Sequence, residues 1–376
     1  MNILLLTAHD IAEFDDLRML TDLGANVFSI GAYTDPSQGS AMRPPLDVPA
    51  YPELAQRCIE QREKHAADPM QFLAFGQIHN VVDWAKADLH QDIIDWADVI
   101  ICHHYLESWI ARQWDRIRHK RVIWRTCGQS NVMLEHVMSQ LDGLEIIRYS
   151  PKEQPAFEAM GHFAGQDALI RFGKYPEDYP AWIPTGTMQF AERNAWTEYE
   201  DHGKFVGPYI GNVTQNMAGR GEHCGLSFWL AATEGLPARP AGPHSELLPG
   251  GVGALSYDEM REYLRRCRAY LYTGTQPASY TLGLIEAMMT GVPVVSMGPK
   301  SWWVPDLFEG CEITARCSDD PRMAATHLRW ILDDDAHARS LSEWTRREAL
   351  DLFGIANVAP QWAAYLGLPV RELVAA

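Results

Sequence analysis

The sequence predicts an α/β protein with two Rossmann-like, doubly wound parallel-sheet domains that face a cleft. Three observations predict this class. Short apolar runs of strand length alternate with stretches of helical period near the N terminus. The same alternation returns after an aperiodic stretch in the middle of the chain. The 376 residues exceed one ordinary domain and suit two. We expect an N-terminal domain at 1–175, a C-terminal domain at 203–355, and a last segment, 356–376, packed back on the N-terminal domain.

The first half opens with a strand, a helix and a strand. "NILLLT" is an apolar run of strand length, and "ANVFSIGAY" is another. Between them, "IAEFDDLRMLTDLG" repeats apolar residues at intervals of three from Ile11 to Leu23 and stops at Gly24, which is typical of a helix. The runs "DVIICHH", "RVIWRTCG" and "LEIIRYSP" predict three further buried strands that end in polar residues. Because ligands collect at the carboxyl ends of parallel strands, these polar ends are candidate binding positions.

The second half repeats the pattern after a crossing between the domains. Residues 173–203 are rich in proline, tyrosine and tryptophan and have no clean period. "GPYIGNVTQ" then predicts a strand, "GLSFWLAATEG" a helix, and "LSYDEMREYLRRCRAYLYTG" a helix and a strand, with Ser256 as N-cap. "ASYTLGLIEAMMTGVPVV" predicts a helix that ends at Gly291 and runs into a strand. "DPRMAATHLRWILDDD" and "ARSLSEWTRREALDLFG" predict two late helices.

Composition argues against several classes of protein. The formal net charge of −17 repels phosphate backbones, so a nucleic-acid partner is disfavoured. The longest apolar runs are far shorter than the roughly 20 residues of a membrane span, and Met1 leads straight into the first strand without a signal peptide. The seven cysteines are scattered, with no CxxC pair, which favours neither disulfides nor a zinc site. We therefore expect a cytoplasmic protein without a metal, and the oligomeric state stays open.

One stretch resembles a known family. "LGLIEAMMTGVPVVSMG" resembles the "GL...EA...G.PVV" signature of retaining glycosyltransferases of the GT-B fold, in particular family 4. The "LSYDEMREYLRRCRAYLYTG" and "ADVIICHH" stretches are similar to flanking motifs of that family. The resemblance is clear over about 205–350 and fainter over 1–150. It implies a hexosyl transfer from a nucleotide-diphosphate sugar, with a UDP-sugar as the expected co-substrate, to a saccharide or other hydroxyl acceptor. It also implies retention of configuration. We expect no cofactor and, since the sequence has no metal signature, a metal-independent reaction.

The resemblance also implies a set of donor-binding residues: Gln215, Arg220, Ser279, Tyr280, Thr281, Leu282, Gly283 and Glu286. At the Glu286 position the family has an acid that accepts hydrogen bonds from the ribose hydroxyls. The backbone N–H groups of "SYTLG" at the helix start would receive the diphosphate. Arg220 stands at the position of the family lysine that neutralises the diphosphate, and Gln215 replaces a family arginine. Ala278 replaces a second family acid that contacts the donor sugar. The loss of this acid affects the expected identity of the sugar and argues against efficient turnover.

Catalytic and acceptor-binding residues are expected mainly in the first half. His103 matches a family histidine that hydrogen-bonds the donor sugar near the reaction centre, and with Arg220 it forms the expected catalytic set. Weaker candidates for acceptor binding lie at strand ends: His9, Asp10, His104, Arg125 and Gln129. The acidic loop "AHDIAEFDD", which joins His9 and Asp10 to Glu13, Asp15 and Asp16, suits acceptor hydroxyls or a metal. For Asp10, capping of the following helix is the favoured interpretation.

Other functions stay open at this point. The loss of an acid at Ala278 fits a nucleotide-sugar binding protein without transferase activity. The same fold also hosts nucleotide-sugar epimerases and phage-type transferases that act on modified nucleic acid, although the charge disfavours the latter. A dinucleotide oxidoreductase is least expected, since no GxGxxG follows the first strand.

Overall fold

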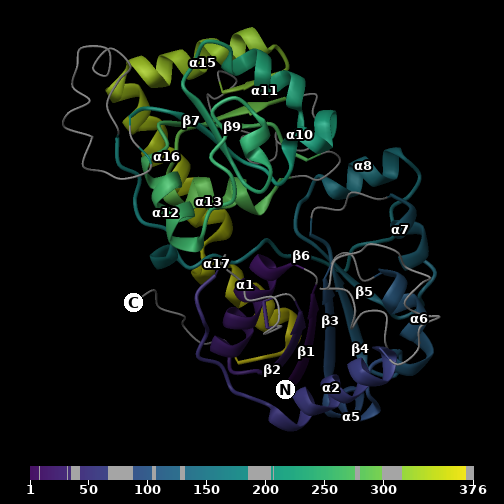
Figure 1. Cartoon of the computed structure of the whole chain (residues 1–376). Helices are drawn as coiled ribbons and strands as arrows, with labels where there is room; N and C mark the ends of the chain where they lie inside the picture. Colours follow the sequence, from purple (N-terminus) through teal and green to yellow (C-terminus); the bar gives the residue numbers. More distant parts are fainter. Residues whose placement is uncertain are drawn as a thin grey trace. The chain divides into compact units, whose positions relative to one another are not determined.

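The chain forms two compact units, each built around one parallel sheet (Figure 1). The computed structural model describes residues 1–7, 9–31, 33–34, 43–66, 88–103, 107–127, 132–184, 205, 207–275, 280–298 and 316–369. The first unit is Met1–Gly173 with Ala356–Val374, and the second is Lys174–Ile355 with the last two residues. The chain therefore passes from the first unit to the second at 173–174 and back again at 355–356.

The first unit contains a six-stranded sheet in the order β2-β1-β3-β4-β5-β6, with every pair parallel. Its strands are β1 (Asn2–Thr7), β2 (Asn26–Gly31), β3 (Val99–His103), β4 (Arg121–Arg125), β5 (Glu145–Arg148) and β6 (Ala168–Leu169). The helices around this sheet are α1 (Asp10–Asp22), α2 (Pro52–Ala66), α5 (Gln91–Trp96), α6 (Glu107–Ile117), α7 (Val132–Met138), α8 (Glu153–Ala159) and α17 (Ile355–Leu366).

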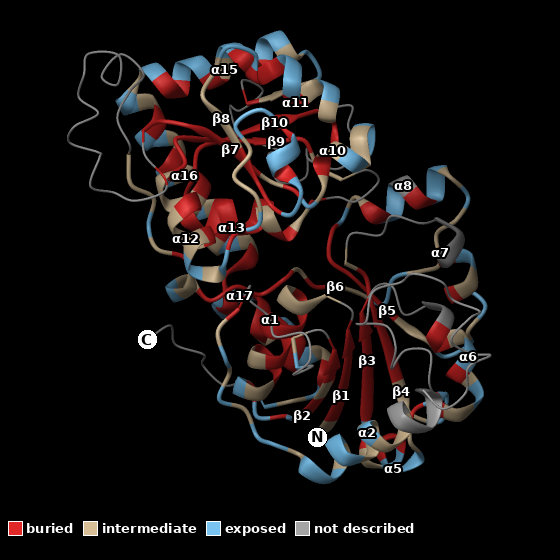
Figure 2. Cartoon of the chain, in the orientation of Figure 1, coloured by how far each residue is buried: buried red, intermediate tan, exposed pale blue. Residues whose placement is uncertain are grey.

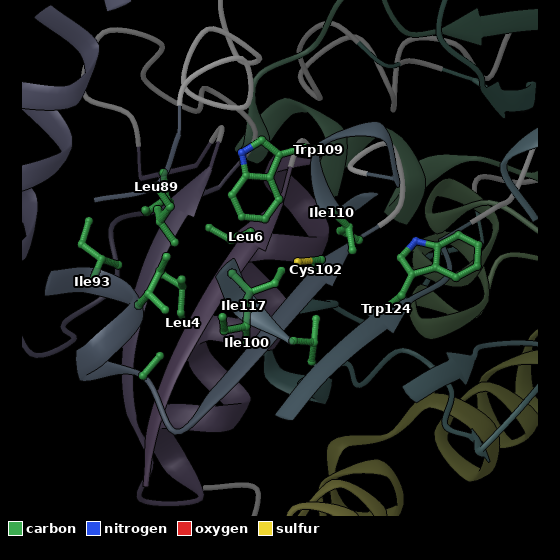
Figure 3. Close-up of a cluster of buried hydrophobic side chains, with 14 of the residues drawn as sticks. Leu4, Leu6, Leu89, Ile93, Ile100, Cys102, Trp109, Ile110, Ile117 and Trp124 are labelled. Atoms are coloured by element: carbon green, nitrogen blue, oxygen red, sulfur yellow. The ribbon is translucent and has the colours of Figure 1, made fainter. Parts of the chain in front are cut away.

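Both faces of the first sheet are buried. Leu4 and Leu6 of β1 join one apolar cluster with residues of α5 and α6, such as Ile93 and Trp109 (Figure 3). Because side chains alternate along a strand, Leu5 points to the opposite face, and it is also fully buried. Figure 2 shows the central strands buried throughout, while the helices carry exposed outer surfaces. Burial on both faces explains why the strands read as continuous apolar runs.

The second unit contains a five-stranded parallel sheet in the order β11-β10-β9-β7-β8. Its strands are β7 (Ile210–Val213), β8 (Ala238–Ala241), β9 (Ala269–Tyr272), β10 (Val294–Met297) and β11 (Cys317–Ser318). Its α-helices are α10 (Met217–Arg220), α11 (Leu226–Thr233), α12 (Tyr257–Arg266), α13 (Leu282–Thr290), α15 (Pro321–Asp333) and α16 (Asp335–Phe353), and its 3-10 turns are η2 (Pro176–Asp178), η5 (Gly221–Cys224) and η6 (Ser245–Leu247).

The predicted element types are confirmed where local signals were strong. Ser256 caps α12 in a capping box, because its hydroxyl accepts from the Glu259 N–H and the Glu259 carboxylate accepts from the Ser256 N–H. Gly291 ends α13 with a φ of 88°, a conformation that glycine adopts without strain. The strand–helix–strand opening of the chain is also as predicted.

Each sheet has a point where the strand order reverses. In the first sheet β1 lies between β2 and β3, and in the second β7 lies between β8 and β9. In the first sheet, the strand that follows β1 in the chain lies on one side of β1, and the next strand lies on its other side. The second sheet has the same arrangement around β7, so the connections after neighbouring strands diverge at this point. Ligands of open α/β sheets bind at such points, beyond the carboxyl ends of the strands. The carboxyl ends of β7 and β9, and those of β1 and β3, are therefore the places to look for a site.

Candidate functional site

The start of α13 presents two backbone donors beyond the carboxyl end of β9. Thr281 is the N-cap residue, and its hydroxyl accepts from the Leu284 N–H at 3.4 Å. The Thr281 N–H itself donates to the Tyr272 hydroxyl at 3.1 Å. Within the described part of the chain, the N–H groups of Leu282 and Gly283 have no acceptor, as is usual in a first helical turn. Together with the positive end of the helix dipole, they can bind an anion.

A glycine sets the position of this helix start against β7. A Cβ atom at Gly283 would lie 3.1 Å from the Val213 carbonyl oxygen and 3.2 Å from the Val213 Cβ. Val213 is the last residue of β7. The helix start thus rests on the carboxyl end of β7, at the reversal point of the sheet, because residue 283 has no side chain.

The loop that follows β7 carries the predicted basic residue. Arg220 ends α10, is half-buried, and donates from Nη1 to the carbonyl oxygen of Gln215 at 3.4 Å. Gln215 itself is exposed. Farther along, the Cys224 Sγ lies 4.0 Å from the Thr275 Oγ1, on the connection from β9 toward α13. Burial raises the pKa of Cys224, and the nearby Arg220 guanidinium opposes this rise. The Arg220 loop therefore lies beside the connection that leads into α13.

Glu286 lies in the second turn of α13 and is only 4% exposed. Its Oε1 is 3.7 Å from the Nζ of Lys174, which is fully buried. Sequence reasoning did not identify Lys174, because it belongs to the proline-rich crossing, which has no period that signals burial. The Tyr280 side chain is also buried, and its ring packs edge-on against Phe353. Ser279 and Ala278 lie outside the described residues.

In the first unit, His103 belongs to a buried polar cluster at the carboxyl ends of β3 and β4. Its Nε2 lies 2.9 Å from the Oδ2 of Asp16, and the Nε of Arg125 lies 3.2 Å from the same oxygen. Burial lowers the pKa of His103, and the hydrogen bond with Asp16 opposes this shift. Among the described residues, the His103 Nδ1 has no hydrogen-bond partner. The Arg125 guanidinium lies between the rings of Phe172 and Trp362, 4.7 and 4.8 Å from their centres.

The loop after β1 holds two further predicted residues. His9, and not Asp10, is the N-cap residue of α1, so the expectation that Asp10 caps this helix is wrong. Asp10 is the first helical residue, and its Oδ1 accepts from the Ile11 N–H at 2.9 Å. The side chains of His9 and Asp10 are 37% and 29% exposed and lie 3.7 Å apart, so both are accessible. The other two predicted acceptor residues, His104 and Gln129, lie outside the described part of the chain.

Glu13 is buried and holds the end of β2. Its carboxylate accepts from the hydroxyls of Ser29 (2.6 Å) and Thr34 (2.7 Å) and from the Tyr33 N–H (2.7 Å). Desolvation by burial raises the pKa of Glu13 to about 7, although these hydrogen bonds oppose the rise. Glu13, Asp15 and Asp16 are all buried, and among the described residues no group of three His, Cys, Asp or Glu side chains is placed to hold a metal ion.

Stability should depend on pH through Glu13. The folded pKa lies above the unfolded value of 4.5, so between about pH 4.5 and pH 7 only the folded state keeps the proton. The free energy of unfolding therefore falls as pH rises through this window, by up to about 3 kcal/mol from this group. Urea unfolding between pH 5 and pH 8 measures the slope. Glu13→Gln should reduce it, and an unchanged slope in this variant would contradict the assignment.

A cavity of about 490 Å³ lies at the other end of α13. It is lined by Trp182, Thr290 and residues of α16 that include Arg346. The Arg346 Nη1 donates to the carbonyl oxygen of Met289 at 2.6 Å and caps the helix. Helix carbonyl groups carry partial negative charge at this end, which disfavours a diphosphate. We therefore place the candidate site at the start of α13.

No protein-family model and no curated protein matches the chain. Solved structures do match it. A sucrose-phosphate synthase from Thermosynechococcus elongatus aligns with a TM-score of 0.62 and 15% identity, covering 98% of both chains. HepE from Anabaena, in complex with UDP and glucose, aligns with a TM-score of 0.64 and 15% identity, covering 98% of this chain and 99% of HepE. A UDP-forming trehalose-phosphate synthase from Burkholderia xenovorans aligns with a TM-score of 0.58 and 11% identity, covering 97% and 98%.

The chain has the GT-B fold. The predicted fold class is thereby confirmed, because the similarity to these GT-B glycosyltransferases extends over nearly the whole length of both chains. The start of α13 and the Arg220 loop lie in the second Rossmann-like unit of this GT-B fold. None of the helices in the described ranges combines the length and the apolarity needed to cross a bilayer.

Proposed function

We propose that the protein is a glycosyltransferase that moves a sugar from a UDP-sugar to a hydroxyl acceptor with retention of configuration. The start of α13 carries this proposal: it offers N–H donors beyond the carboxyl end of β9, the Arg220 loop lies beside the connection from β9, and the buried Glu286 follows one turn later. The titles of the HepE structures, which name complexes with UDP and with UDP-glucose, support the choice of donor.

The donor is bound along α13. The diphosphate accepts from the Leu282 and Gly283 N–H groups, and Arg220, assisted by Gln215, supplies the positive charge. Glu286 follows Leu282 by four residues, which is one helical turn, or roughly 6 Å, on the same face of the helix. That offset suits a ribose attached to the diphosphate, and the carboxylate accepts the ribose hydroxyls.

The reaction proceeds by stabilisation of the leaving group. As the sugar bond breaks, negative charge grows on the departing diphosphate, where the helix dipole and the Arg220 guanidinium stabilise it without a metal. The resemblance assigns His103 a hydrogen bond to the donor sugar. The Nδ1 atom would make this bond, because Nε2 is already paired with Asp16. His9 and Asp10, which are accessible beyond β1, are proposed contacts of the acceptor.

Arg220→Ala should remove most of the stabilisation that UDP or UDP-glucose gives to the folded protein. At a ligand concentration of 100 times the dissociation constant, linkage stabilises the wild type by about 2.7 kcal/mol, seen as a rise in melting temperature. The matched control is Arg265→Ala. Arg265 is also half-buried, but it lies in the last turn of α12, before β9 begins and hence at the amino edge of the same sheet. Equal shifts in the two variants would contradict the donor site.

Transfer is tested separately from binding. Wild-type protein with UDP-glucose and a panel of saccharide acceptors, in buffer containing EDTA, should release UDP and form an α-linked product, as seen by NMR of the anomeric proton. Binding of UDP-glucose without transfer or hydrolysis would favour the binding-protein alternative that Ala278 raises. A changed sugar without an acceptor would indicate an epimerase.

A further inference from the structure

Lys174 is held firmly by the chain around it. It is the first residue of the second unit, at the point where the chain enters that unit. Its N–H donates to the carbonyl oxygen of Phe353 at 2.7 Å, and its carbonyl oxygen accepts from the Ile355 N–H at 2.9 Å. Phe353 and Ile355 lie at the end of α16 and the start of α17, where the chain leaves the unit. Two hydrogen bonds to this returning segment thus fix the backbone from which the Lys174 side chain extends.

The Lys174 side chain extends to Glu286. Its Nζ is fully buried, 3.7 Å from the Glu286 Oε1 and 6.0 Å from the centre of the Tyr179 ring. Burial alone would favour the protonated form of an acid that is 4% exposed, whereas a cation at this distance favours the carboxylate. Lys174 therefore influences both the charge and the position of the Glu286 carboxylate, which the proposed function assigns to binding of the ribose.

We propose that Lys174 is a positioning residue for donor recognition: it keeps Glu286 ionised and fixes the direction of its carboxylate toward the ribose hydroxyls. This inference rests on the proposed function. An ionised carboxylate only accepts hydrogen bonds and can take both ribose hydroxyls at once. A protonated acid would use one oxygen as a donor and would lose the stronger, charge-assisted bonds. Lys174 itself does not touch the donor, so it acts through Glu286.

The test compares the affinities for UDP and for 2′-deoxy-UDP, measured by calorimetry. The two ligands share the base and the diphosphate and differ only at the 2′ position, so the ratio of their affinities reports the contribution of the 2′-hydroxyl. Wild type should prefer UDP by about ten-fold or more, as expected for a hydrogen bond to a charged group. Lys174→Met should bring the ratio close to one, as should Glu286→Gln. In the double variant the ratio should fall no further than in Glu286→Gln, because both changes remove the same contact.

A purely structural role of Lys174 predicts a different result. General damage would weaken both ligands equally and leave the ratio as in wild type, which would overturn the inference. If Lys174→Met does not fold, Lys174→Gln, which keeps a polar group without the charge, gives the same comparison. Lys174→Arg keeps the charge and should retain the preference for UDP.

The two proposals fail in different ways. A wild type that binds neither ligand overturns the donor site and, with it, this role of Lys174. If the wild type binds UDP and the Glu286→Gln variant keeps the wild-type ratio of affinities for UDP and 2′-deoxy-UDP, Glu286 does not bind the ribose. A loss of preference in Glu286→Gln but not in Lys174→Met overturns only the role of Lys174.

Discussion

Replacing Glu135 with alanine should lower the free energy of unfolding by about 3–5 kcal/mol, because the change takes from the buried Arg148 guanidinium the carboxylate that hydrogen-bonds both of its terminal nitrogens. Glu135 and Arg148 form a fully buried, two-pronged ion pair, with N···O distances of 2.7 and 2.8 Å. Glu135 also accepts from the Ala164 N–H at 3.1 Å, and Arg148 donates to the carbonyl oxygen of Gly165 at 2.8 Å. The pair therefore ties β5 to α7 and to the segment before β6.

Urea unfolding followed by tryptophan fluorescence measures this loss. The matched control is Asp115→Ala, which breaks a pair with Arg118 in the same unit, at 3.6 Å and largely exposed. Solvent and salt screen an exposed pair, so this control should unfold at the wild-type urea concentration. A loss below about 1 kcal/mol in Glu135→Ala would mean that water reaches the remaining guanidinium, contrary to its burial.

Trp362→Ala should cost a similar amount, about 3–5 kcal/mol, because it removes a large, fully buried ring. Trp362 lies on α17, in the C-terminal segment that belongs to the first unit. Its ring covers the guanidinium of Arg125, which in turn lies 3.2 Å from Asp16. The cavity left by alanine would therefore loosen the polar cluster around His103 as well as the apolar packing.

Hydrogen exchange shows where this loss falls. Amides of β1, β3 and β4 should lose protection in Trp362→Ala, while those of β7 and β9 keep it, because the ring packs in the first unit. Gln361→Ala is the neighbouring control, since Gln361 is exposed and its side chain donates to the Asn357 carbonyl in the same helix. An equal loss of protection in both sheets would contradict this assignment of α17.

The elements predicted from the sequence and those that were missed differ mostly in the local signals that they carry. The apolar run of β1 and the repeat in α1 each identify one element within a short window. Helix α6 was missed although Ile110, Trp114 and Ile117 recur at helical spacing in "ESWIARQWDRI". Strand β8 contains Pro240, which reads as a breaker. It is tolerated because β8 is an edge strand of its sheet.

In the candidate site, too, some features were predicted from the sequence and others were missed. The helix start at Thr281 and the stop at Gly291 are local features and were readable. The hydrogen bond from the Thr281 N–H to the Tyr272 hydroxyl was not, because Tyr272 belongs to another element, β9. The pairing of His103 with Asp16 was also missed, because the two residues lie on different elements, β3 and α1.

Local sequence patterns predicted most of the alternation of strands and helices, the cap at Ser256, the stop at Gly291 and the position of the acid on α13. These depend on periods and hydrogen bonds within a few residues. The tertiary structure alone decided that Lys174 lies against Glu286, that Arg125 and His103 share Asp16, and that Glu13 is desolvated. Burial and ion pairing between distant residues arise only when the chain closes around them, and in a buried site they set the charge that each side chain carries.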